Sequence, residues 1–222
     1  IMEGKTPIGV IGYANGTSGL AVYLQQSSSE LEWSALSDFP TMTNFSSGAT
    51  AIKDFSGKEN SHNWTLFYGH TNTWNGIGYC HNLTTCGTQK RQWFVPALGE
   101  MNEIAVKNLE AVNDSLLALD TVGAAQIGTS YQYSSTEQNA NNIYVSYQAS
   151  ATDKYTTRIK VQKNYYRCAL PLDFSNGVTK PQACAADYVY TCEADSAKHI
   201  AGGSGTACGG MYQSCKCANG AS

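Results

Sequence analysis

Cysteine is the residue type with the clearest chemical role in this chain of 222 residues. The chain has eight cysteines, and five of them fall within its last 40 residues. Zinc sites favour ligand pairs with two to four residues between them, whereas the close pairs here have five and one. An even number of cysteines in a Gly-rich tail instead indicates disulfides formed in an oxidising compartment. We expect most or all of them to be oxidised, with Cys80–Cys86 as the favoured local pair. The candidate disulfide residues are Cys80, Cys86, Cys168, Cys184, Cys192, Cys208, Cys215 and Cys217.

The histidines and the known catalytic motifs give no second chemistry. His62, His70 and His81 share one segment but lack the spacing of zinc ligands, so we interpret them as scattered loop histidines. No G-x-S-x-G nucleophile motif and no calcium-binding loop is present. Gly4-Lys5-Thr6 lacks the preceding strand and glycine of a phosphate-binding loop. We therefore expect no catalytic residue, no metal and no cofactor.

The stretch "SYQYSSTEQNANNIYVSYQ", residues 130–148, holds four tyrosines, three asparagines and one formal charge. Tyrosine offers a large, rigid contact area and Ser, Asn and Gln add adaptable hydrogen bonds, which is the mixture found in antibody binding loops. We predict an exposed ligand-binding face here; an ordinary sheet surface is the alternative, because tyrosine also favours strands. The candidate ligand-binding residues are Tyr131, Tyr133, Asn139, Asn141, Asn142, Tyr144, Ser146 and Gln148.

Composition limits the class of partner. The net charge is −3, only 14% of residues are charged and no basic patch is visible, so we expect no nucleic-acid partner. No apolar run approaches the roughly 20 residues that span a bilayer. The chain starts at Ile1 without a signal peptide, which says little about its compartment. Its length is enough to bury a substantial core.

Two helices are expected to support the candidate face. The clearest covers 97–119, entered by Pro96, with apolar residues recurring at helical spacing from Leu98 to Leu119. A shorter one is expected within 44–56, with Asn44 as its N-cap and Ala51, Ile52 and Phe55 facing inward. Residues 57–92 read as a long irregular loop tied by cysteines.

Period-two alternation predicts the strands. Asn15-Gly16 marks a hairpin turn, followed by alternating Leu20, Val22 and Leu24. Further strands are expected around 143–147, with Ile143, Val145 and Tyr147 pointing inward, around 158–162, and around 165–172, with Tyr166, Cys168, Leu170 and Leu172 on one face. The core domain is expected to end at Phe174, which gives a domain over 1–174 and a Cys/Gly-rich appendage over 175–222.

Several segments together resemble a known family. "WFVPALGEMNEI" resembles the W-x-x-P-x-x-G-E-L element of the bacterial DUF1566 domains, "YQYSSTE" their Y-W-S-S-T-E strand with Tyr133 in place of Trp, and "NYYRCALPLDF" their closing strand. "SGLAVYL…EWS" resembles their early strand, and the order of the segments over 8–174 matches. That family has a C-type-lectin-like fold in the branch of the formylglycine-generating enzyme. The resemblance implies an α+β fold with a twisted antiparallel sheet and two helices.

The same resemblance shapes the expected function. Variable proteins of diversity-generating retroelements use this fold and display Tyr, Asn and Ser where residues 131–166 lie here, while the tail is similar to Cys/Gly modules of bacterial surface proteins. We expect a secreted or cell-surface module that binds a protein or glycan ligand on another cell or host surface, and that is not an enzyme. The alternatives are an enzyme on the formylglycine-generating-enzyme-like fold and a structural surface protein without a specific ligand.

Overall fold

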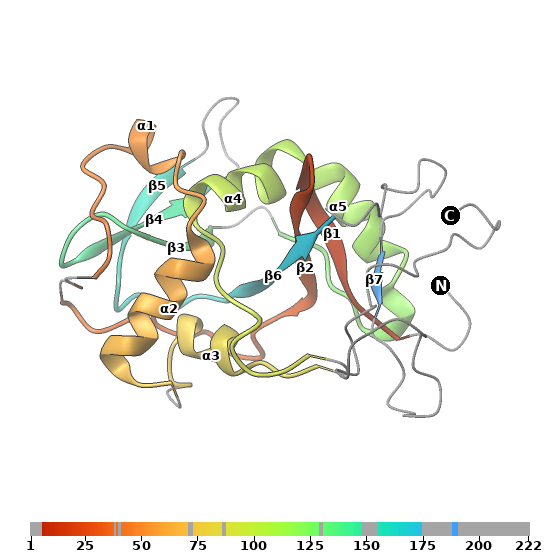
Figure 1. The fold of residues 1–222 in the computed structure, drawn as a ribbon, viewed down its shortest axis with the longest axis horizontal. Helices are drawn as coiled ribbons and strands as arrows, with labels where there is room; N and C mark the ends of the chain where they lie inside the picture. The colour runs from red at the N-terminus through yellow and green to blue at the C-terminus, as the bar shows by residue number, and fades with distance from the viewer. Residues whose placement is uncertain are drawn as a thin grey trace.

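The described residues of this α+β protein form two antiparallel sheets and seven helical segments: five α-helices, one π turn and one 3-10 turn. The computed structural model describes residues 6–37, 39, 41–70, 73–85, 88–128, 131–147 and 155–174, and the backbone of 188–190. Figure 1 shows the two sheets side by side, with α4 and α5 along one side of the molecule and α2 and α3 along the other. No helix among these residues has the length and apolar character that crossing a bilayer requires.

The first sheet grows from the predicted hairpin. Strand β1 (Pro7–Asn15) pairs with β2 (Ser18–Gln26), and Asn15 lies opposite Ser18 across a two-residue turn in which Gly16 has a φ of 61°. A positive φ is costly for residues with a Cβ atom and is readily adopted by glycine. Strand β6 (Arg167–Asp173) pairs with β2, and β7 (Tyr188–Tyr190) pairs with β1, giving the order β6-β2-β1-β7.

One face of this sheet is covered by the long helical segment. Helix α4 (Leu98–Asn102) continues through a π-helical turn, Glu103–Lys107, into α5 (Leu109–Leu117), followed by a short 3-10 turn, Asp120–Val122. The Asn108 N–H donates to the Glu103 carbonyl five residues back, which is the bond that defines a π turn. Leu20, Val22 and Leu24 of β2 lie in one buried cluster with Ile104 and Leu116. The helix predicted over 97–119 is confirmed, with a π turn inside it.

The other face of the sheet packs against helices that the sequence interpretation missed. Helix α2 (Gly57–Tyr68) and helix α3 (Gly76–Asn82) occupy the segment expected to be an irregular loop, so that prediction was wrong. The residues that α2 buries are mostly small or polar, so it lacks an apolar stripe to reveal it. As predicted, one face of β6 is apolar and buried in a common cluster, through Tyr166, Cys168, Leu170 and Leu172.

The second sheet is covered on both faces. It has the order β3-β4-β5, formed by β3 (Gln132–Glu137), β4 (Asn142–Ser146) and β5 (Tyr155–Ile159). On one face Ile143 and Val145 are fully buried in the main core cluster. On the other, Tyr144 packs with Ala51 and Leu98, which come from α1 (Gly48–Ala51) and α4. The prediction of one sheet with two helices was therefore incomplete, because the described residues form two sheets and more than two helices.

The short helix expected within 44–56 exists but begins later. Its N-cap is Ser47, whose hydroxyl accepts from the Thr50 N–H, and Asn44 instead forms an isolated bridge with Glu137. Ala51 is buried as expected, whereas Phe55 is 48% exposed, so that part of the prediction was wrong. Beyond Phe174, the boundary between a core domain and an appendage stays a prediction, and we note that β7 lies on the far side of it.

Candidate binding surface

The middle of the Tyr/Asn/Ser-rich stretch is buried, which corrects the expectation that it is exposed. Tyr133 and Tyr144 are each 2% exposed and Ser146 is 1% exposed. The physical reason is that β3 and β4 are covered on both faces. Side chains that alternate along these strands therefore point into buried layers on both sides, and neither side faces solvent. In this conformation these three residues present almost no surface to a ligand.

The two buried tyrosines act as packing residues. The Tyr144 hydroxyl donates to the Phe45 carbonyl at 3.0 Å, which satisfies the polar end of a ring packed against Leu98. Tyr133 meets Tyr166 edge to face at a centroid distance of 5.4 Å. Burial raises the pKa of the Tyr133 phenol to about 12.

The "SST" residues of the stretch tie the second sheet to its surroundings. The Ser134 carbonyl accepts from the Trp33 indole N–H at 2.9 Å. The Thr136 hydroxyl donates to Asp54 at 2.7 Å and accepts from the Leu98 N–H at 2.7 Å. Because these groups are all buried, each hydrogen bond offsets a desolvation cost, and the segment is structural.

A buried ion pair ends strand β3. Glu137 accepts from Lys160, and neither side chain is exposed to solvent. The Lys160 ammonium also donates to the Ser37 carbonyl at 2.6 Å and lies 4.7 Å from the centre of the Phe39 ring. Glu137, the single formal charge in the predicted binding stretch, therefore forms a buried ion pair and does not face a ligand.

The open end of the hairpin carries a stack of half-buried side chains. Tyr131, just before β3, and Tyr147, just after β4, stack at a centroid distance of 4.6 Å with 24° between their planes. The Arg158 guanidinium of β5 lies 3.6 Å from the centre of the Tyr131 ring. All three side chains are half-buried. We call Tyr131, Tyr147 and Arg158 the stacked triad.

Only one member of the stacked triad was predicted as a site residue. Tyr147 was expected to point inward with Val145, but at the end of β4 it stacks on Tyr131 instead. Arg158 was not singled out, because nothing in its local sequence shows that β5 lies beside β4. Strand pairing places Arg158 opposite Ile143 of β4, and its long side chain reaches the Tyr131 ring.

The other end of the hairpin holds the predicted asparagines. Asn139 and Asn141 are exposed and Asn142 is half-buried. The Asn139 side-chain oxygen accepts from the N–H groups of Asn141 and Asn142 at 2.9 and 3.0 Å, which forms an Asx turn. The predicted face is thus divided into two surface ends separated by a buried middle; Gln148 lies outside the described residues.

The three clustered histidines are brought together rather than scattered. His62 stacks near His70 at 6.1 Å between ring centroids, and the His70 Nδ1 lies 3.2 Å from the His81 Nε2. Burial, with the nearby His70, Arg91 and His62, lowers the pKa of His81 to about 4. Within the described segments no group of three or more His, Cys, Asp or Glu side chains has the arrangement of a metal site.

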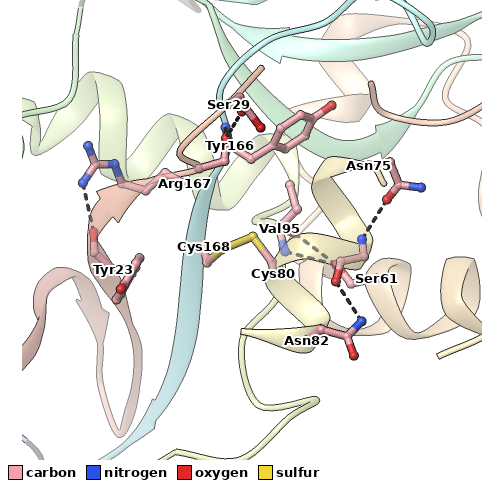
Figure 2. The surroundings of a disulfide bond; sticks show 12 residues. Tyr23, Ser29, Ser61, Asn75, Cys80, Asn82, Val95, Tyr166, Arg167 and Cys168 are labelled. Atoms are coloured by element: carbon pink, nitrogen blue, oxygen red, sulfur yellow. Dashed lines mark hydrogen bonds between the residues drawn. A yellow bond between two sulfur atoms is a disulfide. The ribbon is translucent and has the colours of Figure 1, made fainter. Parts of the chain in front are cut away.

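A disulfide joins α3 to β6, with Cys80 bonded to Cys168 at a Cα–Cα distance of 5.4 Å (Figure 2). The expected Cys80–Cys86 pair is therefore wrong. Both half-cystines are fully buried, and α3 lies across β6, so tertiary packing rather than sequence proximity selects the partner. Beside it, Arg167 donates to the Tyr23 carbonyl at 2.9 Å. The other six predicted disulfide residues, Cys86, Cys184, Cys192, Cys208, Cys215 and Cys217, lie outside the described residues.

The comparisons with known proteins yield a likeness of fold. No protein-family model matches the chain, and no curated protein matches it either. The crystal structure of a fimbrial protein from Bacteroides ovatus ATCC 8483 is similar, with a TM-score of 0.50 and 19% sequence identity. The similarity covers 70% of this chain and 36% of the fimbrial protein, so the chain spans about a third of that neighbour.

Proposed function

We propose that the chain is a ligand-binding module of a bacterial surface or secreted protein, and that the stacked triad contacts the ligand. The observation that carries this proposal is the half-buried stack of Arg158 on Tyr131 and of Tyr131 on Tyr147. The fold shared with a fimbrial protein and the buried disulfide support the location.

The triad is suited to recognition because its side chains are held in place. Strand pairing fixes the backbone on both sides of the hairpin, and the Asn164 side-chain amide donates to the Tyr131 carbonyl at 3.0 Å. A ring and a guanidinium that are already ordered lose little conformational entropy on binding. Tyrosine and arginine are also enriched among residues that dominate binding energy.

The chemistry of the triad defines the ligand that it suits. The tyrosine rings offer flat apolar surface, and the guanidinium offers a delocalised positive charge with planar N–H donors. A protein or glycan that presents an acidic or hydrogen-bond-accepting group beside an apolar surface matches this pair. We propose that the exposed Asn139 and Asn141, at the far end of the hairpin, contribute a separate, weaker contact.

A binding function is preferred over the enzyme alternative. A cysteine enzyme on this fold needs a free thiol, and the two cysteines among the described residues are bonded to each other. The buried Glu137–Lys160 pair is sealed from solvent and has no access to a substrate. A purely structural surface protein remains the second candidate, and it predicts no ligand for the triad.

The proposal also includes the relationship of this chain to a particular fold and family. We propose a C-type-lectin-like fold of the DUF1566 type, supported by the order of the resembling segments: "WFVPALGE" enters α4, "YQYSSTE" contains β3, and "NYYRCALPLDF" contains β6. A retroelement-type variable region over 131–166 would place Tyr131, Tyr147 and Arg158 among the variable positions. Sequencing the locus from related strains tests this, since invariant side chains at these surface positions would contradict it.

The proposed function is tested by screening the purified chain on protein and glycan arrays. The wild type should retain at least one ligand that both the Tyr131→Ala and the Arg158→Gln variants lose. Leu117→Ala, which alters a side chain that is 58% exposed on α5, is the matched control and should bind like the wild type. A wild type that binds no ligand would support the structural alternative. Variants that bind as the wild type does would show that the stacked triad is not the contact surface and would overturn the proposal.

A further inference from the structure

Helix α2 and the loop after it carry an exposed aromatic surface away from the stacked triad. Its large apolar side chains are 45–57% exposed, apart from Tyr68, which is half-buried. Large exposed apolar patches on soluble proteins mark binding sites. We define the α2 aromatic surface as Leu66, Phe67, Tyr68 and Trp74.

The rings of this surface are fixed by contacts with one another and with the core. Tyr68 lies 4.6 Å from the fully buried Trp64, between ring centroids, and 5.8 Å from Trp74 at an interplanar angle of 89°. Phe67 meets Tyr68 at 5.1 Å and the buried Phe39 at 5.3 Å, both edge to face. The exposed rings therefore present ordered faces in different directions.

The segment that carries this surface has an uncharged sequence. Residues 60–89 contain no Asp, Glu, Lys or Arg, although the chain as a whole has 31 such residues, 14 basic and 17 acidic. Hydrogen-bonding side chains accompany the rings: His62 and Asn63 lie one helical turn before Leu66 and Phe67, on the same sides of α2. A ligand that matches this surface is itself uncharged and rich in hydrogen-bonding groups.

The size of the surface argues for a small or extended ligand rather than a stable protein interface. A fully buried aromatic side chain accounts for about 150–250 Å², so these four residues at about half exposure offer on the order of 300–400 Å². Stable protein interfaces bury roughly 800 Å² on each partner. The surface is thus too small for a lasting dimer but large enough for a few sugar rings.

We propose that the α2 aromatic surface binds a neutral oligosaccharide. The C–H groups on one face of a pyranose ring pack on the electron-rich face of an aromatic ring, here the exposed Trp74 and Phe67. The sugar hydroxyls meet the hydrogen-bonding side chains of His62 and Asn63. This site is separate from the stacked triad, whose Arg158 suits an acidic or hydrogen-bond-accepting ligand, so the two proposals stand or fall independently.

The tryptophans supply a direct readout. Trp33, Trp64 and Trp93 are fully buried and Trp74 is 45% exposed, and these are all four tryptophans of the chain. Acrylamide should therefore quench Trp74 selectively. Titration with maltohexaose, cellohexaose, chitohexaose and mannohexaose should protect this fluorescence in a saturable way for at least one of the four, and calorimetry of the same sugar should give a matching dissociation constant.

Two variants and two controls complete the experiment. Trp74→Ala and Phe67→Ala should each weaken binding of that sugar at least tenfold while the melting curve shows that the protein stays folded. Leu117→Ala and Val122→Ala, which change side chains that are 58% and 44% exposed outside both proposed sites, should bind it as the wild type does. The proposal is overturned if none of the four sugars binds, or if binding survives both aromatic variants. It is also overturned if sedimentation shows self-association, lost in those variants, because the occupant is then a second copy.

Discussion

Glu137 and Lys160 form an ion pair from which solvent is fully excluded, joining the end of β3 to the residue that follows β5. Lys160 lies under the rings of Trp33 and Phe39 and donates to the Ser37 carbonyl, so the pair also holds the 33–39 segment against the second sheet. It fixes the strand from which Arg158 projects.

Removing one partner of this pair should destabilise the protein strongly. A buried charge left without its partner costs about 3–5 kcal/mol, so Lys160→Met and Glu137→Gln should each lower the free energy of unfolding by that amount. The double variant should lose less than the sum of the two, because no uncompensated charge remains. Urea denaturation of the four proteins measures the coupling; strictly additive losses would show that the pair does not act as a unit.

The Cys80–Cys168 disulfide should stabilise the fold and resist reduction in the native state. It closes a loop with a sequence separation of 88 residues, and loop-closure entropy predicts about 4–5 kcal/mol. A double Cys→Ala variant should unfold at lower urea concentration by a corresponding amount. Mass spectrometry after thiol alkylation should label these two cysteines only when reductant and denaturant are both present. Their labelling in the native protein without reductant would contradict the bond.

Acid should destabilise the histidine cluster. Since the pKa of His81 is lowered to about 4 in the folded protein, from an ordinary value of 6.5, the unfolded chain takes up a proton first as the pH falls. His81 therefore contributes stability above pH 6.5 that is lost between pH 6.5 and pH 4, on the order of 2 kcal/mol. In His81→Gln this component should be missing, so the wild type should lose more stability than the variant across that window. Parallel losses would show that His81 titrates normally.

Tyr144 and Tyr131 should respond differently to truncation, although both belong to the predicted binding face. Tyr144→Ala removes a buried ring and its hydrogen bond to Phe45, and should cost about 3–5 kcal/mol. Tyr131→Ala removes a half-buried ring and should cost about 1 kcal/mol, the value of its aromatic stack. Thermal melts of the two variants distinguish these values; equal losses would mean that Tyr131 is also a core residue.

Local patterns predicted the elements in which one face of a strand or helix is uniformly apolar. The alternation of Leu20, Val22 and Leu24 and the stripe through Leu98 and Leu116 gave the hairpin and the long helix, because burial there follows hydrophobicity. Tertiary packing decided the rest. Tyr144 alternates with core residues yet is buried itself, because α1 and α4 cover the second face of its sheet.

Two other segments show the same limit in different ways. At the end of β5 the apolar residues face solvent and the charged residue between them is buried. Ile159 and Val161 are 51% and 41% exposed, while Lys160 is fully buried with Glu137. Helix α2 exposes Leu66 and buries Asn60 and Ser61, so its pattern does not predict a helix. The partner of Cys80 and the stack of Arg158 on Tyr131 both depend on contacts between segments distant in sequence.

The dissociation constant of the wild type and of Arg158→Gln for the array-selected ligand tests the proposed function most directly. The account predicts that loss of the guanidinium weakens binding at least tenfold, about 1.4 kcal/mol, while the melting curve shows that the protein stays folded, because Arg158 lies outside the buried core clusters. A dissociation constant that is the same for both proteins would contradict a role for the stacked triad in binding.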